Sequence, residues 1–184
     1  GAQEYYGVVP DICTLGKIVA GGYPLAVVAG RTEFMRHFDR AAVGDSVLPQ
    51  IGTLSGNPVA SAAGLATLDV LRRPGTYETA FATGRQLMDG LAGLLRESGL
   101  PAQVIGMPVL FDVIFAEGEI SDYRGTLRQD AEAMRRFNRA MRAAGVLKGD
   151  SKVYVSAVHD AADVQVVLAA FARAVEEEVA FRRG

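Results

Sequence analysis

Two long stretches of the chain place apolar residues at the spacing of an amphipathic helix. From Thr76 to about Ser98 the apolar positions recur on one helical face, and Gly99 followed by Pro101 marks the helix end. From Asp160 onward the same spacing indicates a final helix. The inward positions are expected to be Phe81, Leu87, Leu91, Leu94 and Leu95 in the first helix, and Val164, Val167, Leu168, Phe171 and Val175 in the last.

Caps and breakers predict three more helices. Asn57 is a good N-cap and Pro58 suits the first helical position, so a helix should begin there and run to Pro74-Gly75. A short helix is expected over Arg31–Phe38, with Thr32 as its cap. The remaining helix is expected to pass through Met134, Phe137 and Met141 and to end at Gly145.

Short apolar runs bounded by glycine, proline or charged residues predict strands. Ile12–Leu15 and Leu25–Ala29 are expected to be short buried strands near the start of the chain. Three more strands are expected at Ala102–Ile105, Val109–Phe115 and Val153–Ser156. Strands alternating with helices indicate an α/β protein, and the break at Pro74-Gly75 divides it into residues 1–75 and a small α/β domain of residues 76–184.

The composition is that of an ordinary globular chain. Of the 184 residues 49% are apolar, and the net charge of −2 gives no electrostatic reason to expect nucleic acid as a partner. The longest weakly polar run, Ile18–Gly30, is shorter than the roughly 20 residues of a membrane-spanning helix. Cys13 is the only cysteine, so no intrachain disulfide can form; it fits strand packing better than a redox role and favours a cytoplasmic location. His37 lacks a second metal ligand at helical spacing, so no metal site is predicted.

Lys17 has an unusual setting for a lysine. It lies between the apolar run ending at Leu15 and the turn at Gly21-Gly22, and Ile18 and Val19 follow it directly. A lysine among apolar neighbours is expected to be partly desolvated, which favours the neutral amine that attacks carbonyl carbon. The alternative is a strand-end lysine whose ammonium reaches water.

A second motif, Gly52-Thr53-Leu54-Ser55-Gly56-Asn57-Pro58, precedes the helix of small residues at 59–68. Gly52 lets the backbone approach a ligand closely, and Thr53 offers a hydroxyl and an amide donor, which suits an anion such as phosphate. By itself the pair could equally be a simple turn before a helix. Lys17 upstream is what favours the binding interpretation.

These motifs, together with Tyr6-Gly7-Val8-Val9-Pro10-Asp11 and Gly21-Gly22-Tyr23-Pro24, resemble the class III aminotransferases of the fold-type-I pyridoxal-phosphate enzymes. Within that family the chain is most similar to the glutamate-1-semialdehyde aminomutase branch. The resemblance implies the end of a large cofactor-binding domain followed by a small C-terminal domain. It further implies that Lys17 forms the Schiff base with pyridoxal 5'-phosphate, and that Gly52 and Thr53 contact the cofactor phosphate of the neighbouring subunit in a homodimer with shared sites.

By the same resemblance, the reaction is amino-group transfer between an amine or amino acid and a keto acid or aldehyde. One departure concerns the segment from Gly145 to Ser156, where aminomutase-like members often carry Pro-Pro-Ser and a Phe-Glu pair. This chain has neither, so intramolecular isomerisation is only an alternative. Lys148, Lys152 and Tyr154 in that segment indicate either a different substrate preference or a solvated loop.

The family's aspartate for the pyridine nitrogen and its same-subunit phosphate site have no counterpart in this chain, which is therefore expected to be the C-terminal part of a longer enzyme and inactive alone. Two other hypotheses stay open. One is a scaffold that keeps the aminotransferase packing without catalysis. The other is a nucleotide-phosphate cradle at Gly16-Lys17 and Gly21-Gly22, which lacks the residue order of a P-loop.

Overall fold

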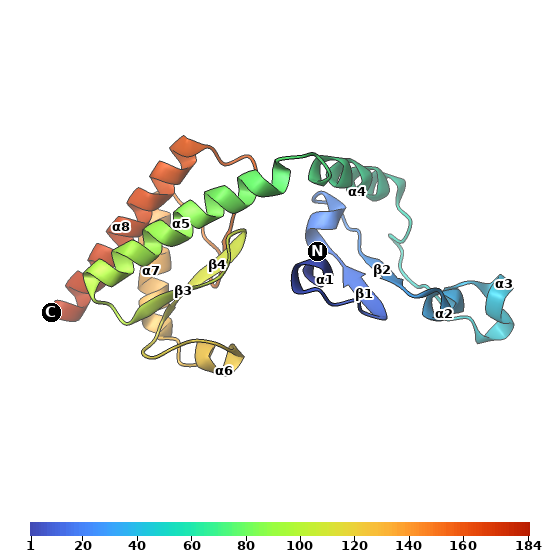
Figure 1. Ribbon diagram of the computed structural model, residues 1–184, viewed down its shortest axis with the longest axis horizontal. Coiled ribbons are helices and arrows are strands. Elements are labelled where there is room, and N and C mark those ends of the chain that lie inside the picture. Colours follow the sequence, from blue (N-terminus) through green and yellow to red (C-terminus); the bar gives the residue numbers. More distant parts are fainter. The chain divides into compact units, whose positions relative to one another are not determined.

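The computed structural model describes all 184 residues, and they form two compact units, Gly1–Arg73 and Pro74–Gly184 (Figure 1). The assignment of residues 1–75 to the end of a cofactor-binding domain, and of residues 76–184 to a small C-terminal domain, stays a prediction.

The first unit is built from short elements and one longer helix. Its two strands pair antiparallel, with Thr14 opposite Val28. The turn after β1, bounded by Gly16 and Gly21, is a 3₁₀ helix, η1, which contacts the helix α4. In chain order the elements are α1 (Ala2–Tyr6), β1 (Ile12–Leu15), η1 (Lys17–Ala20), β2 (Val27–Gly30), α2 (Thr32–Met35), η2 (Arg36–Phe38), α3 (Arg40–Val43), η3 (Gly44–Ser46) and α4 (Pro58–Leu71).

The expectation that the first two strands are buried is wrong for this chain. Ile12 and Leu15 are 49% and 45% exposed, and Val28 on the opposite strand is 45% exposed. The reason is geometric, because a two-stranded sheet has no neighbouring strands and too few covering elements to bury both faces. The strand at Leu25–Ala29 also begins later than predicted, at Val27.

Two other predictions for this unit need correction. The helix expected over Arg31–Phe38 is one turn of α-helix followed by a 3₁₀ turn, and its N-cap is Arg31, with no side-chain cap from Thr32. By contrast, Asn57 caps α4 as predicted, since its Oδ1 accepts from the backbone N–H of Val59 at 2.9 Å and of Ala60 at 3.2 Å.

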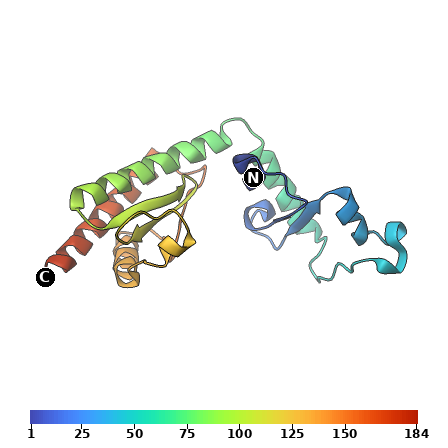
Figure 2. The same ribbon diagram turned by 60° about the horizontal axis from the view of Figure 1, so that its bottom comes forward.

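The second unit packs three long helices against a three-stranded antiparallel sheet in the order β3-β4-β5 (Figure 2). Val104 lies opposite Val113, and Phe111 lies opposite Val153. The strand predicted at Val153–Ser156 is therefore only two residues long. Its elements are α5 (Thr76–Ser98), β3 (Ala102–Met107), β4 (Leu110–Phe115), α6 (Tyr123–Thr126), α7 (Ala131–Ala143), β5 (Val153–Tyr154) and α8 (Ala161–Arg183).

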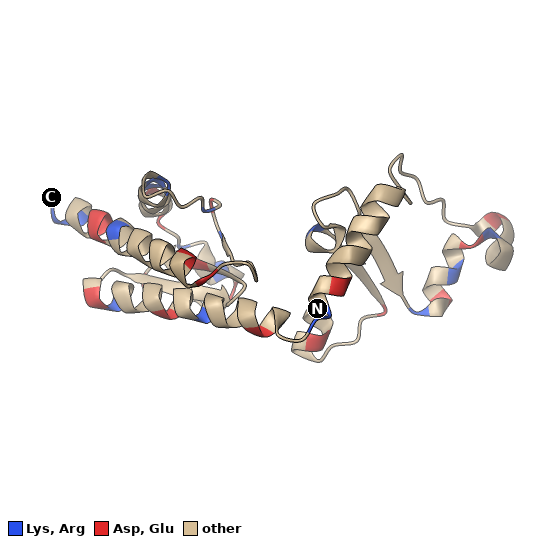
Figure 3. Cartoon of the chain, turned by 90° about the horizontal axis from the view of Figure 1, so that it is seen from above, with Lys and Arg blue, Asp and Glu red and all other residues tan.

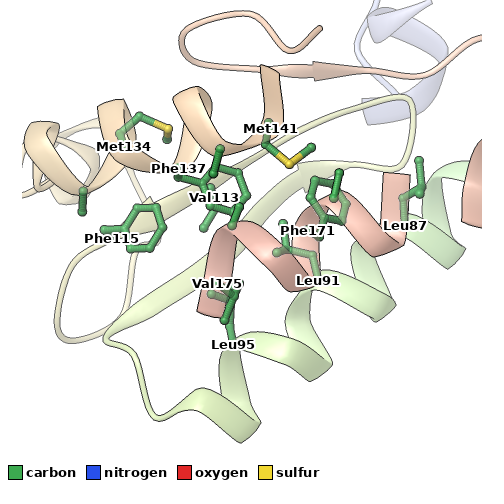
Figure 4. Close-up of a cluster of buried hydrophobic side chains, with 14 of the residues drawn as sticks. Leu87, Leu91, Leu95, Val113, Phe115, Met134, Phe137, Met141, Phe171 and Val175 are labelled. Atoms are coloured by element: carbon green, nitrogen blue, oxygen red, sulfur yellow. The ribbon is translucent and has the colours of Figure 1, made fainter. Parts of the chain in front are cut away.

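The hydrophobic core of the second unit lies between these helices and one face of the sheet (Figure 4). Phe137 of α7 contacts Phe115 of β4 and Phe171 of α8, with ring centroids 5.7 and 6.2 Å apart. All three rings are at most 1% exposed. Most of the positions predicted to face inward on α5, α7 and α8 are buried: Leu87, Leu91, Leu95, Met134, Phe137, Met141, Val164, Phe171 and Val175. Four others are half-buried: Phe81, Leu94, Val167 and Leu168.

A close backbone contact fixes the β3–β4 turn against α5. A Cβ on Gly84 of α5 would lie 1.8 Å from the carbonyl oxygen of Pro108, which is far inside van der Waals contact. Only glycine therefore permits this approach. Within the hairpin, Gly106 has a φ of +118°, and a Cβ there would meet the Leu110 carbonyl oxygen at 2.6 Å.

A network of charges around the buried Glu178 joins the start of α7 to the end of α8. The Glu178 carboxylate is 1% exposed and accepts from Arg136 at 2.7 and 2.9 Å and from Arg182 at 2.7 Å. Arg182 also pairs with Asp130, the N-cap of α7, at 3.0 Å. Burial by itself raises the pKa of Glu178, but the hydrogen bonds from both guanidinium groups outweigh it and hold the pKa below 4.5.

Candidate functional site

Lys17 is the first residue of η1, and its backbone is in the left-handed region with a φ of +56°. It is the one non-glycine residue of the chain with a positive φ. Such a conformation raises the energy of a residue that carries a Cβ, and it persists only where surrounding contacts impose it. The side chain is exposed in this chain, so the expected desolvation by Leu15, Ile18 and Val19 is not observed here.

The contacts that hold the Lys17 turn come from α4. A Cβ on Gly64 of α4 would lie 3.0 Å from the carbonyl oxygen of Val19 in η1. On the other side, Gly21 has a φ of +58° and approaches α4 so closely that a Cβ would lie 2.5 Å from the Thr67 hydroxyl oxygen. Ala20, between these contacts, is 2% exposed. The turn is therefore packed backbone to backbone on the helix, which fixes the position of Lys17 along it.

The Gly52-Thr53 motif forms an exposed turn at the start of the same helix. The Ser55 N–H donates to the Gly52 carbonyl at 3.0 Å, and the Asn57 N–H donates to that of Leu54 at 3.1 Å. The N–H groups of Gly52 and Thr53 and the Thr53 hydroxyl have no acceptor within the chain. They line an open depression of about 990 Å³ together with Pro24–Ala26.

Exposed donors on a glycine-bounded turn fit a phosphate group, which needs several N–H and O–H donors in a small space. Lys17 offers an amine on a rigid turn, which fits the aldehyde of pyridoxal phosphate. Lys17 is not among the residues that line the Gly52-Thr53 depression. Lys17 and the Gly52-Thr53 turn therefore lie in separate places on this chain, and their membership of one site stays a prediction.

The segment with Lys148 differs from the expectation of a solvated loop. The Lys148 ammonium is buried and lies 3.1 Å from the Asp112 carboxylate and 3.0 Å from the Gly149 carbonyl oxygen. Burial raises the pKa of Asp112 above 3.8, although the charge of Lys148 opposes this shift. Lys152 and Tyr154, in contrast, are exposed. The buried lysine is thus Lys148, and the expectation that apolar neighbours desolvate Lys17 is wrong for this chain, because its side chain is exposed.

Other site types find no support in the structure. No group of three histidine, cysteine, aspartate or glutamate residues could hold a metal ion. None of the helices combines the length and the apolar character needed to cross a membrane. In Figure 3 acidic and basic positions are interspersed along the helices.

Comparison with known proteins identifies the family of the chain. Residues 1–174 match the family described as aminotransferase class-III. The structure of an omega-transaminase from Sphaerobacter thermophilus is 31% identical, with a TM-score of 0.90 over 100% of this chain and 41% of that one. A β-phenylalanine aminotransferase from Variovorax paradoxus has 24% identity and a TM-score of 0.87 over 98% of this chain and 41% of that one. A glutamate-1-semialdehyde aminomutase from Pseudomonas aeruginosa PAO1 has 23% identity and a TM-score of 0.82 over 97% and 41%.

The chain therefore belongs to the class III aminotransferases, and the predicted family is confirmed. The α/β fold is that of the fold-type-I pyridoxal-phosphate transferases, as the sequence motifs predict. The chain spans about two fifths of the length of these structures, at 41% of each.

Proposed function

We propose that this chain is part of a pyridoxal-phosphate-dependent enzyme that transfers an amino group between an amine or amino acid and a keto acid or aldehyde. The observation that carries the proposal is Lys17, a lysine held in left-handed backbone geometry on a turn packed against α4. Membership of the class III aminotransferases supports the reaction class. A cytoplasmic location is part of the same proposal and rests on the single cysteine.

In this proposal each residue has a distinct role. Pyridoxal phosphate, when bound, supplies the ring that accepts electrons from the substrate. Lys17 would hold the cofactor through its amine, and the same amine, once free, would take and return the proton at the substrate α-carbon. The N–H groups of Gly52 and Thr53 and the Thr53 hydroxyl would hold the cofactor phosphate of the neighbouring subunit.

Intramolecular amino transfer, as in an aminomutase, is the second candidate. It is favoured by the similarity in fold to the Pseudomonas aeruginosa aminomutase, at 23% identity. The segment from Gly145 to Tyr154 favours transfer between two molecules over isomerisation, because the Phe-Glu pair of aminomutase-like members is missing there. In the same segment Lys148 forms an ion pair with Asp112. The scaffold hypothesis, without any catalysis, is the third.

A borohydride experiment tests the proposal on the protein as it occurs in the cell. Reduction in the presence of pyridoxal phosphate should attach the cofactor to Lys17, and peptide mapping should find it there. The structure provides an internal comparison, because Lys148 is buried in an ion pair whereas Lys152, like Lys17, is exposed. A label on Lys152 at equal yield would contradict the assignment and favour a scaffold.

A second measurement tests the reaction itself, amino-group transfer between two molecules. Lys17→Ala should abolish amino-group exchange between an amino acid and a keto acid while circular dichroism remains unchanged. Exchange of label between two different molecules distinguishes transfer from isomerisation, in which the amino group stays within one molecule. The 184-residue chain alone should be inactive, and turnover by it alone would show that the active site has been misplaced.

A further inference from the structure

Gly64, the one glycine of α4, is a buried point at which two other segments of the first unit meet the helix. A Cβ at this position would lie 3.0 Å from the carbonyl oxygen of Val19 in η1 and 2.8 Å from the Cδ2 atom of Leu25. Val19 belongs to the same 3₁₀ turn as Lys17. Leu25 is half-buried and lines the depression at the Gly52-Thr53 turn. One glycine therefore borders both candidate parts of the site.

A second contact on α4, at Ala63 and Thr67, holds the other end of η1. Gly21 closes the turn with a φ of +58°, and a Cβ on it would lie 2.5 Å from the Thr67 hydroxyl oxygen and 3.0 Å from the Ala63 carbonyl oxygen. The Thr67 hydroxyl is itself held in place, because it donates to the Ala63 carbonyl at 2.9 Å. Since this end of η1 is fixed, a displacement at Val19 would tilt the turn and move Lys17 with it.

The two neighbours of Gly64 differ in how they could make room for a methyl group. The Leu25 atom is the end of a flexible side chain, which can rotate to another staggered position. The Val19 atom belongs to the backbone, so relief there requires η1 to shift by a few tenths of an ångström. Alanine has a higher helix propensity than glycine, which offsets part of this cost. We therefore expect a methyl group at position 64 to change the position of the turn more than the stability of the unit.

We propose that Gly64 is a positioning residue of the proposed active site, because the absence of a side chain lets the Lys17 turn pack directly on α4. Through Val19 it sets where the Lys17 amine lies, and through Leu25 it sets the wall beside the Gly52-Thr53 turn. The inference rests on the proposed function, which gives the position of the Lys17 amine its importance. The contacts of Gly64 are with Val19 and Leu25, so its effect on Lys17 is transmitted through η1.

Gly64→Ala in the complete enzyme tests this role. The kcat of amino-group exchange, divided by the fraction of Lys17 that borohydride links to cofactor in a parallel sample, should fall by about tenfold, because a displaced amine is a poorer base. The thermal midpoint of unfolding should move by less than about 5 °C. A purely structural role would instead lower the amount of folded enzyme and leave kcat per linked Lys17 unchanged.

Hydrogen exchange in the enzyme freed of cofactor gives a readout that does not depend on catalysis. The Gly21 N–H donates to the Ile18 carbonyl at 3.2 Å, so its exchange rate reports how firmly η1 is held. In Gly64→Ala the peptide covering residues 17–25 should exchange at least about threefold faster, because η1 no longer packs closely on α4. Mass spectrometry of this peptide would measure the change.

Ala66→Ser is the matched control, because it adds one heavy atom at an exposed position of the same helix and should leave both exchange and kcat unchanged. A second pair of variants applies if Gly64→Ala alone does not fold. Leu25→Ala removes the nearer of the two contacts, so Gly64→Ala added to it meets only the Val19 carbonyl. The double variant should still have a kcat at least about threefold below that of Leu25→Ala.

The outcomes separate this inference from the function on which it rests. Failure of the unsubstituted enzyme to attach cofactor to Lys17 would overturn the proposed function together with the role of Gly64. Attachment to Lys17 with an unchanged kcat in Gly64→Ala would overturn the role of Gly64 alone. An equal loss of kcat in Ala66→Ser would do the same.

Discussion

At the scale of single residues, Lys17 combines a reactive group with an unfavourable backbone. Its φ of +56° lies in a region where glycine has no steric penalty and other residues do. Energetically unfavourable backbone of this kind is typical of functional sites, because selection for stability alone would replace the strained residue with glycine. The strained backbone of Lys17 and its amine group therefore both support a functional role for this residue.

This leads to a prediction about two substitutions. Lys17→Gly and Lys17→Ala both remove the amine, but only glycine relieves the backbone. The first unit of Lys17→Gly should be more stable than that of Lys17→Ala by about 1 kcal/mol. Urea titrations followed by NMR signals of residues 1–73 would measure this difference. Equal stability would mean that the turn does not hold Lys17 in left-handed geometry in solution.

Glu178 illustrates the opposite case, in which a buried charge is fully paired. Its pKa in the folded chain is lowered below 4.5, so its contribution to stability is present above that pH and is lost as the pH falls through the folded-state value. Glu178→Gln should lower the free energy of unfolding of the second unit at neutral pH by about 3 kcal/mol. It should also make the unfolding free energy less dependent on pH below 4.5.

Glu177→Gln is the matched control for this prediction. Glu177 pairs with Arg173 at 2.9 Å one helical turn away, but both side chains are more than half exposed, at 52% and 56%. Its loss should change stability by less than about 0.5 kcal/mol. If both variants behaved alike at neutral pH, the Arg136–Glu178–Arg182 network would contribute no more than a surface pair.

At the scale of elements, the long helices of the second unit follow the sequence pattern closely. The helix predicted from Thr76 to about Ser98 has those bounds, because a glycine follows its last turn and its apolar face is broad. Periodicity detects such helices since each one buries a continuous stripe of side chains. The sequence pattern does not predict the buried ion pairs of Asp112 and Glu178. For Asp112 a signal exists, because a single acid inside the apolar strand Leu110–Phe115 indicates a buried partner of opposite charge.

The first unit was predicted less well for a physical reason. Its short elements depend on contacts distant in sequence, and no window of residues reports those contacts. The 3₁₀ geometry of Lys17–Ala20 follows from packing on Gly64, which lies more than forty positions later in the printed sequence. Likewise, motifs identify Lys17, Gly52 and Thr53 as candidate site residues, but only the structure shows that all three are exposed and that the turn beginning at Lys17 packs on α4.

The contact between α5 and the β3–β4 turn gives a prediction at this scale. Gly84→Ala should destabilise the second unit by several kcal/mol, since a Cβ would lie 1.8 Å from the Pro108 carbonyl oxygen and backbone must move. Gly93→Ala in the same helix is the control, because the nearest atom to its Cβ would be 3.9 Å away. It should stabilise the helix by about 0.5–1 kcal/mol. Thermal unfolding of both variants would show whether the turn is seated as described.

At the scale of the whole molecule, we propose that two subunits share the active site. Within one chain Lys17 does not line the Gly52-Thr53 depression, which is what a composite site requires. Thr53→Ala should weaken retention of pyridoxal phosphate by about 1–3 kcal/mol, the loss of a hydrogen bond to a charged group. Equilibrium dialysis of the complete enzyme would measure the change.

Mixed dimers test the sharing directly. When Lys17→Ala and Thr53→Ala subunits of the complete enzyme are exchanged, each mixed dimer has one site with both defects and one site with neither. Activity should therefore rise above that of either parent at limiting cofactor. No recovery after verified exchange of subunits would indicate that Lys17 and Thr53 serve the same site within one chain.

The left-handed backbone at Lys17 also bears on how such a protein changes under selection. In a library screened only for resistance to heat or protease, glycine at position 17 would be enriched, because it removes strain without disturbing the packing on α4. The enriched protein would fold, resist digestion and catalyse nothing. A lineage that keeps lysine at this position despite the strain is therefore one in which amine chemistry is still under selection.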